Sequence, residues 1–233
     1  MKFSLTVLFL STIITTAFSQ PYEVGCKILT EKQVSEIFTA TIKQELKLTF
    51  PIRRVYSYSD KSGRYYCILT QSLDSISPDN DTIHRRIRAV NLKLDSGELH
   101  KTWELNDHLE ATGYEEYNIR FWTGYMDFKD YDHDSLIEPI IVYGTLTPNA
   151  FDDGRVKILI YYKGQKIAIR HQNSSFDEGR GTQVDNTFYD LPSILQTAVQ
   201  QKMKEMMDDN VSIFPYGWEK AMKNKKTVFS ERK

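Results

Sequence analysis

Repeated pairs of β-forming runs, each joined by a short glycine-containing turn, constrain the fold of this chain most strongly. The first pair lies in RRVYSYSDKSGRYYCILTQSL, where residues 60–63 have the composition of a turn. The second pair surrounds residues 95–97 (Asp-Ser-Gly), and the third surrounds residues 163–165 (Lys-Gly-Gln). Short strands at this spacing, joined by tight turns, are typical of an antiparallel sheet or sandwich.

Two helical segments flank this β-rich middle. Residues 30–46 begin with Thr30 and Gln33 in the order of a capping box, and apolar residues then recur at helical spacing. Residues 190–210 repeat the pattern, with methionines that we expect to fill the core. The sequence therefore predicts an α+β protein, in which an N-terminal and a C-terminal helix cover a mainly antiparallel sheet.

Residues 1–19 have the pattern of a secretory signal peptide. Lys2 precedes an apolar run from Phe3 to Ile14, and residues 17–19 (Ala-Phe-Ser) have the small–x–small form of a cleavage site. An uncleaved anchor is the alternative. Cleavage would leave residues 20–233 as a single α+β domain with no second stretch long enough to span a bilayer. We therefore expect a periplasmic or secreted protein.

Charge and motifs narrow the classes of function. The chain has 30 Lys and Arg against 31 Asp and Glu, so it lacks the basic surplus that a nucleic-acid partner demands. No G-x-S-x-G, H-E-x-x-H or P-loop motif is present. The carboxylates of Glu104 and Asp107 form a pair of the kind that glycosidases use, but no second motif supports it. The sequence leans away from an enzyme without deciding the matter.

The two cysteines, Cys26 and Cys67, are the candidates for a disulfide. An oxidising compartment favours their pairing. The bridge would close a loop of about 42 residues and contribute roughly 4 kcal/mol in the chain-entropy model. We expect this disulfide, with two free thiols as the alternative.

The stretch KDYDHDSLIEPIIVYG, residues 129–144, contains a candidate calcium loop. Asp130, Asp132 and Asp134 occupy positions 1, 3 and 5, Leu136 offers a backbone carbonyl at position 7, and Glu138 stands at position 9. Calcium takes six to eight oxygen ligands, and carboxylates this close repel one another strongly without a cation. We expect a structural Ca²⁺ site. An acidic turn that binds nothing and another divalent cation are the alternatives.

The loop differs from an EF-hand at two positions. Position 12 is Ile141 rather than glutamate, and position 6 is Ser135 rather than glycine. A positive φ at Ser135 would cost on the order of 1 kcal/mol. The arrangement instead resembles the strand–loop–strand calcium loops of the integrin α-chain and of FG-GAP repeats. That resemblance implies the five residues at positions 1, 3, 5, 7 and 9 as the ligands.

Residues 62–66, Ser-Gly-Arg-Tyr-Tyr, fit the SGxxY pattern of periplasmic lysozyme inhibitors. In that family a loop of this kind enters the lysozyme cleft. The resemblance implies Ser62, Gly63 and Tyr66 as partner-binding residues and a lysozyme-like cell-wall hydrolase as the partner. Ordinary turn chemistry at a hairpin tip is the alternative.

A basic strand follows the first hairpin. Alternation places His84, Arg86 and Arg88 on one face. Arginine forks suit an anionic glycan or phosphate. A solvated face paired with neighbouring carboxylates explains the same pattern.

Three segments together resemble a family of exported bacterial proteins described as surface polysaccharide biosynthesis proteins. They are RFWTGYMDFKDYDHDSLIEPIIVYGT, YSYSDKSGRYYCIL and FPYGWEKAMKNKK. In that family a tryptophan-containing strand leads into a D-x-D-x-D loop and then PIIVYG. The resemblance implies a non-enzymatic role in cell-surface polysaccharide production or envelope maintenance, with a surface glycan as a partner. An inhibitor or immunity protein that binds a cell-wall hydrolase is the rival, and a glycan-processing enzyme is a third class.

Overall fold

The computed structural model describes residues 23–77, 80–109, 116–148, 150 and 153–231. The predicted signal peptide lies outside these residues. No helix among them is long and apolar enough to cross a membrane.

The first of two large antiparallel sheets has five strands in the order β1-β2-β3-β6-β7. Its strands are β1 (Gly25–Ile28), β2 (Ile52–Asp60), β3 (Gly63–Gln71), β6 (Arg86–Asp95) and β7 (Glu98–His108). Two of the predicted hairpins, β2–β3 and β6–β7, belong to it. A small ribbon, β4 (Ser75–Ile76) with β5 (Thr82–Ile83), extends the connection between β3 and β6.

The second sheet has seven strands in the order β14-β13-β12-β11-β10-β8, with β9 also paired to β10. Its strands are β8 (Asn118–Phe121), β9 (Asp127–Lys129), β10 (Glu138–Leu146), β11 (Arg155–Tyr162), β12 (Gln165–Gln172), β13 (Gly181–Val184) and β14 (Val228–Ser230). The third predicted hairpin, β11–β12, turns at Lys163 and Gly164, whose φ values are 46° and 79°. Positive φ at both central residues is what a tight type I′ hairpin turn requires.

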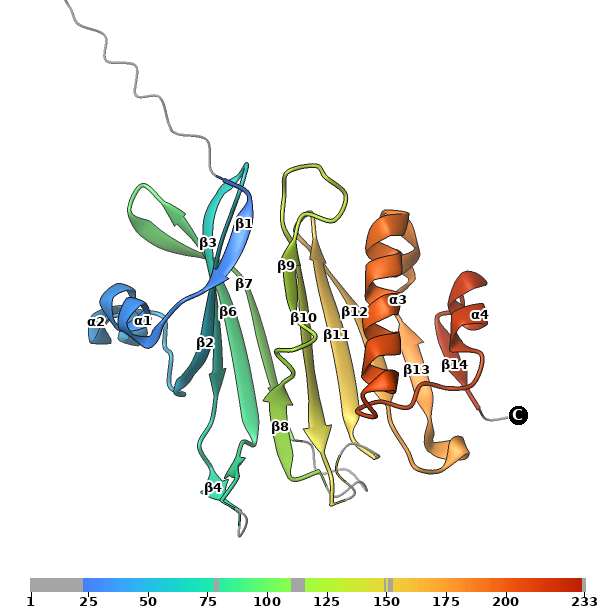
Figure 1. Ribbon diagram of the computed structural model, residues 1–233. Coiled ribbons are helices and arrows are strands. Elements are labelled where there is room, and N and C mark those ends of the chain that lie inside the picture. The colour runs from blue at the N-terminus through green and yellow to red at the C-terminus, as the bar shows by residue number, and fades with distance from the viewer. Residues whose placement is uncertain (1–22, 78–79, 110–115, 149, 151–152, 232–233) are drawn as a thin grey trace, which may run out of the picture.

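Helices cover the outer faces of the two sheets, which gives four layers (Figure 1). The layer beside the five-stranded sheet consists of α1 (Glu31–Ile37) and α2 (Ala40–Glu45), and α3 (Ser193–Asp208) and α4 (Trp218–Lys223) lie on the seven-stranded side. Short 3₁₀ turns, Asp177–Gly179 and Asn186–Asp190, lie between β12 and α3. The predicted α+β class, dominated by antiparallel sheet, is confirmed.

The predicted N-terminal helix is divided into α1 and α2. Thr30 and Gln33 form the expected capping box of α1, and Thr39 caps α2 by accepting a hydrogen bond from the Ile42 amide at 3.4 Å. Between them, Phe38 is completely buried and packs edge-on against Tyr66 at a centroid distance of 5.6 Å. The helix is interrupted at this buried ring. The periodicity of the sequence did not predict the interruption.

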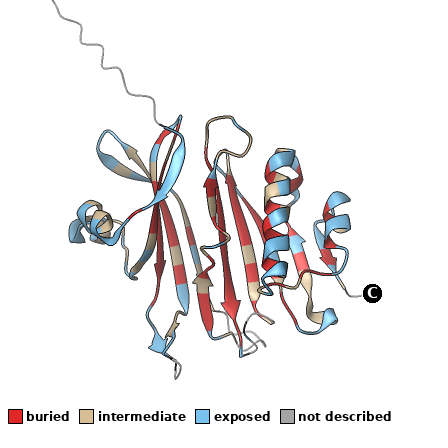
Figure 2. Cartoon of the chain, viewed as in Figure 1, coloured by how far each residue is buried: buried red, intermediate tan, exposed pale blue. Residues whose placement is uncertain are grey.

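Two apolar cores result from this layering. The larger core contains inner-face residues of both sheets and the buried face of α3, including Met203 and Met206, as expected. The smaller core lies between the five-stranded sheet and α1–α2. Figure 2 shows the buried residues concentrated in the central strands. The sheet ends are therefore the places where polar groups from both sheets meet.

The predicted disulfide is absent from the structure, where Cys26 and Cys67 are free thiols. Cys26 opposes Tyr58 across β1–β2, and Cys67 opposes Tyr56 across β2–β3, so the whole of β2 separates the two cysteines. Two strand spacings amount to about 10 Å, which exceeds the roughly 7 Å that a disulfide spans between Cα atoms. Sequence reasoning could not foresee this intervening strand.

Candidate metal centre

The acidic loop, residues 130–138, connects β9 to β10. Strand pairing closes its base, because Lys129 at the end of β9 opposes Glu138 at the start of β10. One carboxylate oxygen from each of Asp130, Asp132, Asp134 and Glu138 lies within 4.8 Å of the others. This cluster could hold a metal ion. The structure thus brings together the four carboxylates that the sequence spacing selected, whereas the role of the Leu136 carbonyl stays a prediction.

Backbone amides of the loop turn its carboxylates inward. Each acidic side chain accepts one hydrogen bond from an amide nearby in the chain, so the loop wraps around its own oxygens. The four bonds are Tyr131 N to Glu138 Oε2 at 2.8 Å, Leu136 N to Asp134 Oδ1 at 2.9 Å, Ser135 N to Asp130 Oδ2 at 3.0 Å and Asp134 N to Asp132 Oδ1 at 3.2 Å.

Protein groups compensate two carboxylates of the cluster, those of Asp130 and Glu138, only in part. Asp130 Oδ1 is buried and has no hydrogen-bond partner among the described residues. Glu138 is only 2% exposed. Burial, followed by repulsion from Asp132, Asp130 and Asp134, raises the pKa of Glu138 to about 7. A bound cation would satisfy the orphan oxygen and favour the ionised form of Glu138.

The backbone of the loop is left-handed at two non-glycine residues. His133 has φ 60° and Ser135 has φ 66°. Position 6 of the loop therefore adopts the conformation for which glycine is preferred, and Ser135 carries the associated strain.

Lysines supply limited compensation for the four carboxylates. Lys163 Nζ lies 3.2 Å from Asp134 Oδ2. Lys61 Nζ donates to the backbone oxygen of Asp134 rather than to a carboxylate. The cluster therefore keeps an excess of negative charge around the point where its oxygens converge.

The acidic loop also joins the ends of the two sheets. From the β2–β3 hairpin, the Lys61 amide donates to the Ser135 carbonyl at 3.0 Å, and Asp60 Oδ2 accepts from the Ile137 amide at 3.2 Å. From the β11–β12 hairpin, Tyr162 donates to Asp132 Oδ2 at 3.0 Å. The sequence did not predict these contacts. The turn accounts for an aspartate at position 60, because Oδ1 accepts from Ser62, but nothing local indicates that Oδ2 bonds Ile137.

The residues of the SGxxY pattern do not form one exposed surface. Ser62 is exposed, but its hydroxyl donates to Asp60 Oδ1 and lies 2.8 Å from the Tyr65 hydroxyl oxygen. Gly63 is buried, and Tyr66 is 6% exposed in the core beneath α1. Of the three predicted partner-binding residues, only Ser62 is exposed.

Both arginines of the basic strand are paired with carboxylates, so they do not form an open anion site. Arg88 bonds Glu104 at 2.7 Å, and Arg86 lies 3.8 Å from Asp74. Bonds from Arg88, then Lys101 and Asn106, lower the pKa of Glu104 to about 2.

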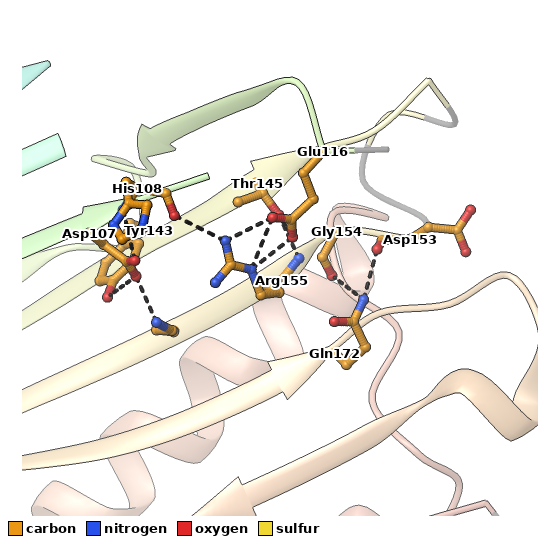
Figure 3. A network of polar contacts seen from close by, with 10 residues as sticks. Asp107, His108, Glu116, Tyr143, Thr145, Asp153, Gly154, Arg155 and Gln172 are labelled. Atoms are coloured by element: carbon orange, nitrogen blue, oxygen red, sulfur yellow. Dashed lines mark hydrogen bonds and ion pairs between the residues drawn. The ribbon is translucent and has the colours of Figure 1, made fainter. Parts of the chain in front are cut away.

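A second polar cluster lies at the opposite end of β10 (Figure 3). We call it the paired-charge network, and it consists of Asp107, Glu116, Tyr143, Arg155 and Lys157. Arg155 Nη2 bonds Glu116 at 2.7 Å, while Asp107 accepts from Lys157 at 2.6 Å and from Tyr143 at 2.8 Å.

The environment of Asp107 stabilises its charge. Burial opposes ionisation, but the bonds from Lys157 and Tyr143 prevail and lower the pKa of Asp107 below its usual value. Glu104 and Asp107, the carboxylates considered for glycosidase chemistry, are thus each bonded to cations.

No protein-family model, curated protein or solved structure matches this chain.

Proposed function

We propose that the acidic loop binds one calcium ion with a structural role, in a non-enzymatic protein that acts outside the cytoplasm in cell-surface polysaccharide production or envelope maintenance. The observation that supports the metal is the convergence of four carboxylates within 4.8 Å around the buried, unpartnered Asp130 Oδ1.

The donor set favours calcium over other metals. All side-chain donors in the cluster are carboxylate oxygens, whereas zinc and copper sites use nitrogen or sulfur ligands. Magnesium requires near-ideal octahedral geometry and retains several waters. Calcium accepts a flexible set of carboxylate and carbonyl oxygens, so the Leu136 carbonyl would complete a set of five protein ligands.

The surroundings of the loop support a structural role. Its carboxylates accept hydrogen bonds from the loop's own amides, and its backbone bonds the β2–β3 hairpin. An ion at this point would hold both sheet ends at once. The cellular role rests on the signal-peptide pattern and on the resemblance to exported surface polysaccharide biosynthesis proteins.

Calorimetric titration tests the metal. Calcium should bind with a stoichiometry of one, magnesium should bind more weakly, and Asp130→Asn should reduce calcium affinity by at least about ten-fold, because it removes one charged ligand. Asp81→Asn, at an exposed acid outside the loop, is the matched control. Wild-type affinity in Asp130→Asn would remove the loop from the proposal.

Complementation tests the cellular role. Deleting the gene in its native host should lower the amount of surface polysaccharide, and wild-type protein should restore it. Asp130→Asn should restore it only in part, because less folded protein accumulates. An unchanged polysaccharide level in the deletion strain would contradict this role while leaving the calcium site intact.

A further inference from the structure

A pocket of about 610 Å³ opens on the outer face of the five-stranded sheet, where β1–β3 meet α1. We call it the N-terminal pocket. It is separate from the acidic loop, none of whose residues line it. Its volume lies within the roughly 300–1,000 Å³ typical of small-molecule sites.

Strand register places four polar side chains together in this pocket. Ser57 of β2 opposes Lys27 of β1 on one side and Tyr66 of β3 on the other. One step along, Ser59 opposes Gly25 and Arg64 in the same way. Residues that oppose one another on neighbouring strands project from the same face. The pocket therefore receives two hydroxyls, a guanidinium and an ammonium from adjacent strands.

These polar groups have no internal partners, unlike those of the basic strand and the paired-charge network. Ser57 is 8% exposed, yet its hydroxyl forms no side-chain hydrogen bond within the described part of the chain. Neither Lys27 nor Arg64 forms an ion pair with another described residue. The Ser57 hydroxyl and both cations are therefore free to bond a ligand that enters the pocket.

The charge of the pocket is positive, and one side of it is apolar. Lys27 and Arg64 outweigh Glu23, the one acid among the described residues that line it. Leu29, Ile37 and the ring of Tyr66 supply apolar surface beside these charges. An oxyanion at the cations, attached to a body with a carbon face, matches this combination.

We propose that the N-terminal pocket binds an acidic saccharide unit, whose oxyanion contacts Arg64 and Lys27 while the hydroxyls of Ser57 and Ser59 bond the oxyanion or the ring hydroxyls. The arginine fork suits either a carboxylate or a phosphate. The oxyanion site stands on the pocket alone, whereas the saccharide body rests on the proposed function in surface polysaccharide production.

Titration of the purified protein in calcium tests the ligand class. Glucuronate carries the carboxylate and glucose 1-phosphate carries the phosphate, so the tighter of the two identifies the oxyanion. Glucose should bind at least about ten-fold more weakly than the tighter one, because it lacks the charge-assisted bonds. Equal binding of glucose, or no binding of either acid, would overturn the proposal. Equal binding of acetate and inorganic phosphate would overturn its saccharide part.

Arg64→Gln should weaken binding of the acidic saccharide by at least about ten-fold. Arg53→Gln is the matched control, since Arg53 is an exposed arginine on β2 that does not line the pocket. Wild-type affinity in Arg64→Gln, or an equal loss in Arg53→Gln, would contradict the assignment.

Gly25→Val provides a variant that adds a side chain beside Ser59 and Arg64 in the pocket without disturbing the sheet. A Cβ atom at Gly25 meets no atom within 4 Å, and valine suits a strand. This variant should weaken saccharide binding but keep the wild-type melting temperature and calcium response. Calcium binding and saccharide binding are read separately, so the failure of one proposal is distinguishable from failure of the other.

Discussion

The acidic loop and the paired-charge network lie at opposite ends of β10, and each bonds the five-stranded sheet to the seven-stranded sheet. In the network every carboxylate has its cation, with Arg155 at Glu116 and Lys157 at Asp107. In the loop four carboxylates converge, and Asp134 pairs with an exposed lysine, Lys163.

The difference appears in the electrostatics of the two regions. The pKa of Asp107 is lowered by its partners, whereas the pKa of Glu138 is raised to about 7 by burial and by the neighbouring aspartates. The network is therefore complete with protein groups alone. A bound cation would stabilise the ionised form of the loop, so calcium should affect one end of the sandwich and leave the other unchanged.

The largest effect should come from breaking the paired-charge network. Arg155→Met leaves Glu116, whose side chain is 1% exposed, without its cation, and the loss of a buried partner costs about 3–5 kcal/mol. Urea unfolding should show this cost equally in calcium and in chelator. Arg53→Met is the control, and a cost that appears only in calcium would contradict the independence of the two ends.

The stability contributions of the two regions should change in opposite directions as pH changes. In chelator, the folded pKa of Glu138 exceeds its unfolded value of 4.5, so the folded state binds more protons and stability falls as pH rises from about 4.5 to 7. Asp107 behaves oppositely, because its lowered pKa contributes stability that is present above pH 3.8 and lost in stronger acid.

Isosteric variants isolate these two contributions. Glu138→Gln should flatten the chelator profile between pH 4.5 and 7, and Asp107→Asn should flatten only its acid limb. Denaturant midpoints across pH provide the measurement. An unchanged profile in Glu138→Gln would contradict the raised pKa of Glu138.

The sequence predicted local features of this molecule well and long-range ones poorly. Turn residues correctly identified the three predicted hairpins, and the alternating aspartates identified the carboxylates of the loop, because both signals involve neighbours in the chain. The pairing of Arg155 with Glu116 joins residues 39 apart, and that of Lys157 with Asp107 joins residues 50 apart. No local pattern specifies such pairs, and the same limit applies to the expected disulfide between Cys26 and Cys67, which the structure does not contain.

A smaller effect should come from relieving strain in the acidic loop. Ser135→Gly removes the cost of φ 66° and should stabilise the protein by about 1 kcal/mol while raising calcium affinity. Ser96→Gly, in the β6–β7 turn with φ 50°, is the matched control. It should stabilise by a similar amount without changing calcium affinity, as thermal unfolding and calorimetry would show. Lower calcium affinity in Ser135→Gly would contradict the claim that strain at this position opposes calcium binding.

The smallest effect should come from Lys163, which lies beside Asp134 on the exposed side of the loop. Lys163→Met removes a cation that competes with the metal, so calcium affinity should rise by about two- to five-fold. Lys204→Met, at an exposed lysine of α3, should leave the affinity unchanged. A weaker calcium affinity in Lys163→Met would show that this lysine supports the metal site instead.

The most direct test is the melting temperature of the wild-type protein and of Asp130→Asn, each measured in chelator and in calcium. Calcium at about 100 times its Kd stabilises a folded state by about 2.7 kcal/mol, which corresponds to roughly 5–10 °C for a chain of this size. The wild type should show this shift, Asp130→Asn should lose most of it, and Arg155→Met should keep it from a lower starting temperature. An identical melting temperature of the wild type in chelator and in calcium would contradict the central claim.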